Sequence, residues 1–189
     1  MGTRGTLGIR KNKKDFLMYN HYDSYPESLG QEVVDFVKGV KDFDGLAVKT
    51  AKLKAVDGDK KIPLKWEKKY RKFHQEVSSG DDWYSFLRDL QGVDFFKALL
   101  KDEIEHIILG NDFIKDSLFC EYGYIINLDT NKLEFWVGFQ DKPQKGNRYG
   151  VKPESGSDNE YYPCKKVGEC PLDKIPEDWQ SKFFPKEEE

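Results

Sequence analysis

The stretch Thr3-Arg-Gly-Thr-Leu-Gly-Ile-Arg-Lys-Asn-Lys-Lys-Asp-Phe-Leu-Met-Tyr-Asn20 decides the fold, because it is typical of a β-hairpin at the start of the chain. Small or apolar residues alternate with polar ones over 3–10, and the pattern breaks at the lysine-rich residues 11–14. A second apolar run follows over 15–20. Alternation with a period of two indicates strands with one buried face, so we expect a sheet whose first strand begins at the amino terminus.

The middle of the chain predicts helices, and its last third predicts strands again. Apolar residues recur at helical spacing, and Ser24 and Glu27 stand at the spacing of a capping box. The expected helices cover 26–41, 46–56, 63–77, 83–90 and 95–102. The expected later elements are a hairpin with strands 118–128 and 133–139 around the turn 129–132, a strand at 161–167 and a helix at 177–183.

This order predicts an α+β fold with a mainly antiparallel sheet, in which a helical block is inserted between N-terminal and C-terminal strands. The length of 189 residues fits one domain over 1–189. Residues 141–159 are rich in Gly, Pro, Lys and Ser and predict a mobile loop, while 185–189 predict a charged tail.

The composition excludes several classes of protein. Hydrophobic residues make up 38 % of the chain and aromatic residues 14 %, which is enough for a packed core. Lys+Arg 31 against Asp+Glu 34 gives 31 − 34 = −3, which is too balanced to indicate nucleic-acid binding by the whole chain. No apolar run approaches the ~20 residues of a membrane span, and no secretory signal is readable, so we expect a cytoplasmic protein without a membrane partner.

The cysteines do not indicate a metal site or a cofactor. Cys120, Cys164 and Cys170 form no Cys-x-x-Cys pair and have no histidine at zinc spacing. Cys164 and Cys170 could meet across a hairpin, but cytoplasmic chemistry favours free thiols, buried or half-buried. Cys120 as a nucleophile would need a cationic or imidazole neighbour, which only the fold could supply through His21.

The segment Tyr19-Asn-His-Tyr-Asp-Ser-Tyr-Pro26 is the most suggestive candidate for a site, because polar and aromatic residues crowd where a strand stops. If the backbone stays extended, His21 and Asp23 project to the same side, and the carboxylate can orient the imidazole. The alternative is that these residues close the turn and that Asp23 or Ser24 caps the following helix.

The opening Met1-Gly2-Thr3, the short hairpin and the segment Tyr19–Ser24 resemble the start of N-terminal-nucleophile hydrolases, such as bile-salt and penicillin acylases. The resemblance implies an αββα fold, with Gly2 in the place of the nucleophile and Asp23 in that of a substrate-positioning aspartate. Glycine has no side chain for attack, and Thr3 could serve only after removal of both preceding residues. The resemblance therefore implies that amide hydrolysis is lost or altered.

A second resemblance covers most of the chain. The stretches Met1–Gly5, Tyr19–Pro26, Asp116–Tyr122, Asn127–Asp129 and Leu133–Glu134 resemble a group of bacterial and phage-encoded proteins that brings no assigned activity.

Together these observations predict one pocket and two competing functions for it. Its expected lining comprises Gly2, Thr3, Arg4, Asn20, His21, Tyr22 and Asp23. In an enzyme, His21 would carry protons, Asp23 would orient it, and Arg4 would clamp an anion, with Thr3 as the residual nucleophile candidate. In an accessory or regulatory protein, for example one acting in phage–host conflict, Arg4 and His21 would contact a protein or nucleotide ligand.

A third hypothesis, nucleic-acid binding, rests on the segment from Lys49 to Lys72. This segment contains ten basic and three acidic residues, which gives a local charge of 10 − 3 = +7. Nucleic-acid modules also need exposed aromatic residues, whereas Trp66, Tyr70 and Phe73 share one helical stripe and indicate a buried face. The alternative, a solvated amphipathic helix, is therefore favoured.

Overall fold

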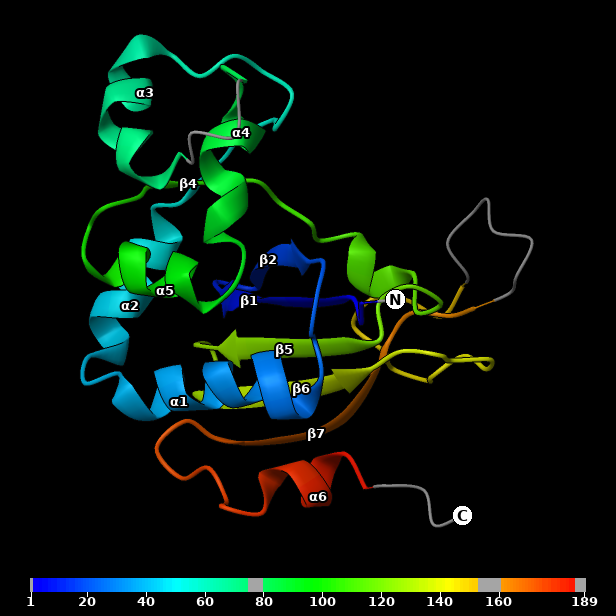
Figure 1. Cartoon of the computed structure of the whole chain (residues 1–189). Coiled ribbons are helices and arrows are strands. Elements are labelled where there is room, and N and C mark those ends of the chain that lie inside the picture. Colours follow the sequence, from blue (N-terminus) through cyan, green and yellow to red (C-terminus); the bar gives the residue numbers. More distant parts are fainter. Residues whose placement is uncertain (1, 75–79, 153–160, 186–189) are drawn as a thin grey trace. The chain divides into compact units, whose positions relative to one another are not determined.

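The computed structural model describes residues 2–74, 80–152 and 161–185 (Figure 1). The chain folds into two compact units, one formed by Met1–Val40 with Gly110–Glu189 and the other by Lys41–Leu109. The helical block expected between the hairpins thus forms a unit of its own. Compactness alone does not show that a unit folds independently, so the expectation of one domain stays a prediction.

The first unit is built on a five-stranded sheet of order β2-β1-β5-β6-β7. Neighbouring strands are antiparallel except β1 and β5, which are parallel, so the predicted α+β class with a mainly antiparallel sheet is confirmed. The strands are β1 (Gly5–Lys11), β2 (Lys14–Asn20), β5 (Tyr122–Asn127), β6 (Lys132–Val137) and β7 (Lys165–Pro171). Because β1 and β5 start at the same end, that end also holds the last residues of β2 and β6.

The turn between β1 and β2 depends on a carboxylate from the far side of the sequence. Asn12 and Lys13 both have positive φ, 53° and 61°, as a two-residue hairpin turn requires. Their backbone N–H groups donate to the two carboxylate oxygens of Asp129, at 2.8 and 2.7 Å. Lys13 can therefore occupy a conformation that usually favours Gly or Asn.

One face of the sheet is covered by helices. These are the π-helical turn η1 (Pro26–Gly30), α1 (Gln31–Gly39) and α6 (Trp179–Phe183). Phe135 on β6 stacks against Trp179 and Phe183, with ring centroids 5.3 and 4.6 Å apart. The Tyr124 hydroxyl donates to the Ser24 carbonyl at 2.9 Å, which ties β5 to the segment before η1.

The opposite face is covered largely by irregular chain and the short helix η4 (Phe113–Lys115). A buried cluster lies there, formed by Leu17, Ile114, Cys120, Ile125, Trp136 and Cys164. The Asn111 amide accepts from Leu17 N at 2.9 Å and donates to Asp15 O at 2.8 Å. The Asn111 side chain thus pairs with backbone groups of edge strand β2 that would otherwise pair with a further strand.

The second unit is mainly helical, with a two-stranded parallel sheet. Its elements are α2 (Phe43–Ala51), β3 (Lys54–Ala55), α3 (Leu64–Tyr70), η2 (Arg71–Phe73), α4 (Trp83–Leu87), η3 (Arg88–Leu90), α5 (Val93–Leu100) and β4 (His106–Ile107). Phe86, Phe96 and Leu99 are fully buried, in agreement with the apolar stripes of the sequence.

Several predicted boundaries are wrong for identifiable reasons. The last strand is Lys165–Pro171 rather than 161–167, since Pro163 has no N–H to donate and Cys164 joins the buried cluster. The helix expected to reach 56 ends at Ala51, because Lys54 and Ala55 pair with β4. The capping box does not form: the Ser24 hydroxyl accepts from Asn20 Nδ2 at 2.9 Å, and η1 begins without a side-chain cap.

Other expectations fall partly or wholly outside the described residues. The expected loop over 141–159 is described only to 152, where it forms turns, and of the tail at 185–189 only Pro185 is described. Within the described ranges, none of the helices has the length and apolar character that crossing a membrane requires. The three cysteines are free and buried, as expected.

Candidate functional site

The structure brings the opening residues beside the segment Tyr19–Pro26, at the end of the sheet where β1 starts. Ser24 N donates to the Thr3 carbonyl at 3.1 Å. A Cβ placed on Gly2 would lie 2.6 Å from the ring of Tyr22. Arg4 is held by β5-side residues instead, since Glu121 N donates to the Arg4 carbonyl at 2.9 Å.

The expected acid–base pair is not assembled in this arrangement. Asp23 has φ of 50°, so the backbone is not extended between His21 and Asp23, and the expectation that both project to one side loses its basis. His21 Nδ1 is hydrogen-bonded to the Tyr19 hydroxyl, and among the described residues no hydrogen bond joins His21 to Asp23. The Thr3 side chain lies in the interior, with the residue 2 % exposed.

An aromatic pocket of about 870 Å³ opens at the same end of the sheet. Of the residues that line this pocket, only Tyr25 and Pro26 belong to the segment Tyr19–Pro26 that the sequence singled out. We call the aromatic pocket the space lined by Tyr25, Pro26, Glu27, Tyr122, Val137, Val167, Gln180, Ser181, Phe183, Phe184 and Pro185.

Tyr122 is the central wall of the aromatic pocket. Its ring centroid lies 6.0 Å from that of Tyr25 and 5.7 Å from that of Phe184, so these three lining rings contact one another. Gln180 Nε2 donates to the Pro26 carbonyl at 3.4 Å and joins α6 to η1. Burial raises the pKa of Tyr122, and the charges of Glu121 and Glu27 raise it further, so the phenol stays neutral at physiological pH.

Further exposed aromatic side chains lie near the same end of the sheet. Tyr22 and Tyr25 follow β2, Phe119 precedes β5, and Phe139 follows β6, so the sheet topology gathers all four at one end. Arg4 covers the Phe119 ring at 5.3 Å from its centroid. Clustered exposed aromatic residues are typical of surfaces that bind other proteins.

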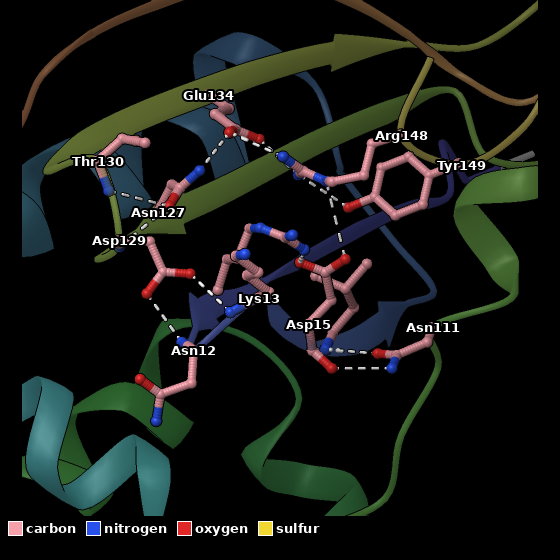
Figure 2. Close-up of polar contacts among 12 residues, drawn as sticks. Asn12, Lys13, Asp15, Asn111, Asn127, Asp129, Thr130, Glu134, Arg148 and Tyr149 are labelled. Carbon is pink, nitrogen blue, oxygen red and sulfur yellow. Dashed lines mark hydrogen bonds and ion pairs between the residues drawn. The ribbon is translucent and has the colours of Figure 1, made fainter. Parts of the chain in front are cut away.

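A second candidate site is a network of charged residues over the irregularly covered face of the sheet (Figure 2). Arg148, from the loop after β6, donates through Nη1 and Nη2 to the two carboxylate oxygens of Glu134, at 3.0 and 2.6 Å. Asn127 donates to the same carboxylate at 2.7 Å, and Arg148 Nη2 also donates to the Tyr149 hydroxyl at 3.0 Å. Asp15 lies 3.8 Å from Arg148 Nε.

The Glu134 carboxylate is charged although it is buried. Burial alone would raise its pKa, but the hydrogen bonds from Arg148 and Asn127 outweigh this effect, and the pKa lies below its usual value. Arg148 in turn lies against the rings of Trp136 and Tyr149, with centroids 5.1 and 5.0 Å from Cζ. The guanidinium is therefore fixed in position.

The basic segment from Lys49 to Lys72 is largely neutralised within the second unit. Six of its ten cations pair with carboxylates, and four of the five carboxylates involved lie outside the segment. The pairs are Lys49–Asp102, Lys54–Glu105, Lys61–Asp81, Lys69–Glu105, Arg71–Glu67 and Lys72–Glu103. Nucleic-acid binding by this segment stays a prediction, and this pairing favours the alternative of a solvated face.

The second unit also buries a histidine that the sequence did not single out. The Tyr70 hydroxyl is hydrogen-bonded to His106 Nδ1 at 2.8 Å and accepts from Glu105 N at 3.0 Å. Burial lowers the pKa of His106 and raises that of Tyr70 to about 12, so both are neutral at physiological pH. This pair has the properties of a structural contact.

The sequence around Glu134 contains a pattern from which the charged network could have been found. In strand 132–137 Glu134 alternates with Leu133 and Phe135 and shares a face with Trp136, so a glutamate stands on an apolar face. Its partner Arg148 lies in a loop and had no such pattern. Comparison of the chain with known protein families, with curated proteins and with solved structures finds no match.

Proposed function

We propose that this chain is a non-catalytic binding protein that docks a protein partner at the end of the sheet, with a basic side chain of the partner in the aromatic pocket. The observation that carries the proposal is the combination of four aromatic residues with one carboxylate around an open space. This function corresponds to the alternative of an accessory or regulatory protein.

Charge complementarity determines the chemistry of the partner. Of the described residues that line the aromatic pocket, Glu27 alone carries a charge. The faces of aromatic rings attract cations, and the attraction is worth about 0.5–2 kcal/mol depending on exposure. A guanidinium also stacks on rings and pairs with a carboxylate, so arginine fits the pocket best.

Amide hydrolysis has weaker support from the geometry. Gly2 offers no nucleophile, the Thr3 side chain is buried, and His21 bonds to Tyr19 instead of Asp23. The resemblance to N-terminal-nucleophile hydrolases stays a prediction about descent.

The test uses a minimal ligand and its uncharged analogue. Titration of the ¹⁵N-labelled protein with N-acetyl-arginine amide should give saturable shifts in the amide signals of Glu27, Tyr122 and Phe184. A single anchored side chain is worth on the order of 4 kcal/mol, so binding in the millimolar range is expected. N-acetyl-citrulline amide, which has the same shape without the charge, should bind at least about tenfold more weakly, the equivalent of ~1.4 kcal/mol.

Two variants distinguish binding in the aromatic pocket from binding elsewhere on the surface. Glu27→Gln removes the charge but keeps the shape, and it should reduce the preference for arginine over citrulline to the part that the aromatic rings supply. Glu32→Gln removes an exposed charge from α1 outside the pocket lining and should leave the preference intact. Equal binding of both ligands by the unmodified protein would refute the proposal.

A further inference from the structure

A smaller pocket lies beside the charged network and has the opposite charge. It encloses about 270 Å³ between β6, the loop after β6 and the start of β7. We call it the cationic pocket; it is lined by Trp136, Gln144, Lys145, Gly146, Asn147, Arg148, Lys165 and Lys166. Four of these eight residues are basic and none is acidic.

The positive charge of the cationic pocket is only partly compensated. Glu134 balances Arg148, and Glu169 is shared between Lys132 and Lys166, with a distance of 2.7 Å to Lys166. Lys145 and Lys165 are exposed and form no ion pair with the residues that the structure describes. Asp15, which also pairs with Arg10, lies 3.8 Å from Arg148 Nε, so among the described residues three carboxylates face these five cations.

Arg148 provides the fixed part of the site. Figure 2 shows its guanidinium beside Glu134 and Tyr149. The ring of Trp136 also lies against it, so an anion would not have to order it. Arg148 Nε is buried and lacks a hydrogen-bond partner within the described ranges, since the Asp15 carboxylate oxygen lies 3.8 Å away, beyond hydrogen-bond distance. A buried N–H without a partner is unfavourable, and an oxygen from a ligand or an ordered water would satisfy it.

We propose that the cationic pocket binds the phosphate group of a small phosphomonoester, with Lys145 and Lys166 as mobile charges around the fixed Arg148. A phosphomonoester carries close to two negative charges at neutral pH, which matches the excess of positive charge around the pocket. The pocket lies just below the volumes typical of drug-sized ligands, so the ligand is small. Lysine serves as a point charge for phosphate, and Trp136 forms an apolar wall.

The experiment compares inorganic phosphate, adenosine 5′-monophosphate and adenosine as probes on the full chain. Both phosphate-bearing probes should give saturable shifts in the backbone amide signals of Gly146, Arg148 and Lys166, and in the Nε–H signal of Arg148. Adenosine should give none. Shifts from adenosine equal to those from its monophosphate, or the absence of saturable shifts with phosphate at millimolar concentration, would overturn the proposal.

Matched variants distinguish a site from general attraction of anions. Lys145→Gln/Lys166→Gln should weaken phosphate binding by at least about tenfold for each lysine, and Glu169 keeps its partner Lys132 in this variant. Lys38→Gln/Lys174→Gln removes the same charge from exposed positions outside the cationic pocket and should change affinity by less than about threefold. Equal losses in the two double variants would show non-specific attraction and sink the proposal. All substituted lysines are exposed, so folding should be retained and is checked by circular dichroism.

Discussion

Arg148→Met tests whether the charged network is a buried ion pair. Methionine keeps most of the aliphatic volume of arginine but removes the guanidinium. Glu134 would then retain Asn127 and Trp136 as donors, at 2.7 and 3.2 Å, without a countercharge. The Glu134 side chain is 2 % exposed, so the carboxylate cannot turn to water without local opening of the fold.

The size of the effect follows from the burial of the two partners. Breaking a fully buried pair costs about 3–5 kcal/mol, whereas surface pairs contribute about 0–1 kcal/mol. Because the Arg148 side chain is 24 % exposed and that of Glu134 is almost fully buried, we expect a loss of about 3 kcal/mol in the free energy of unfolding. For a chain of this length that corresponds to a melting temperature lower by roughly 6–12 °C.

The pH dependence of the loss gives a second check with a defined sign. With Arg148 present, the folded pKa of Glu134 lies below its unfolded value of about 4.3. Its contribution to stability is then present above that unfolded value and is lost as the pH falls through the folded value. In Arg148→Met, burial dominates and the folded pKa rises above 4.3, so stability falls as the pH rises through this range.

Urea unfolding at pH 7 and at pH 4.5, followed by circular dichroism, measures both effects. The deficit of Arg148→Met should be larger at pH 7 than at pH 4.5. Adding Glu134→Gln to Arg148→Met should recover part of the loss, because the unpaired charge is removed. A deficit below about 1 kcal/mol that is equal at the two pH values would refute the reasoning, since it is the behaviour of a surface pair.

Three further predictions concern packing in the two units. Gly8→Ala would place Cβ 2.3 and 2.7 Å from backbone atoms of β2 and should cost about 3 kcal/mol in urea unfolding, whereas Gly39→Ala, which meets nothing within 4 Å, should be neutral or stabilising by up to about 1 kcal/mol. Tyr70→Phe removes the hydrogen-bond partner of His106 and of the Glu105 backbone N–H, and it should lower the free energy of unfolding by about 1–3 kcal/mol. Tyr84→Phe, at an exposed position, should leave the melting temperature unchanged. The three buried thiols should react with Ellman's reagent only after unfolding, and rapid reaction of the native protein at pH 8 would contradict their burial.

The hairpin strands could be predicted from the sequence because their signal is local. Over 3–20 and 118–139, alternation with a period of two needs no knowledge of the neighbouring strand. The strand order is a different kind of information. The pairing that places β5 beside β1 joins residues more than a hundred positions apart, and no local pattern records it.

The charged network was missed for the same reason. Arg10 pairs across the strands with Asp15 and with Asn127, so one row of the sheet carries three polar residues. Each of them alone is consistent with a solvated strand end. Only the register brings the row beside Glu134 and under Arg148, where it becomes a network.

For the charged network the sequence showed too little, whereas for the basic segment a count within the segment overestimated the uncompensated positive charge. A window over 49–72 excludes Asp81, Asp102, Glu103 and Glu105, which the fold places against its lysines. The described ion pairs of this basic segment join positions 20 to 53 apart, except for Arg71–Glu67. Net charge in a sequence window therefore overestimates the field that a ligand would meet.

The candidate site combines both situations: the segment 19–26 and the aromatic pocket lie at the same end of the sheet, but only Tyr25 and Pro26 of this segment line the pocket. Strand ends collect polar and aromatic residues, and the segment 19–26 was identified on that ground. The roles given to His21 and Asp23 assumed an extended backbone, and the φ of 50° at Asp23 removes that assumption. Tyr122 and Phe184, which complete the aromatic pocket, come from other elements and reach Tyr25 only in the folded sheet. No local sequence pattern indicates that Tyr122 or Phe184 lines a pocket. The role of these rings must therefore be tested on the folded protein.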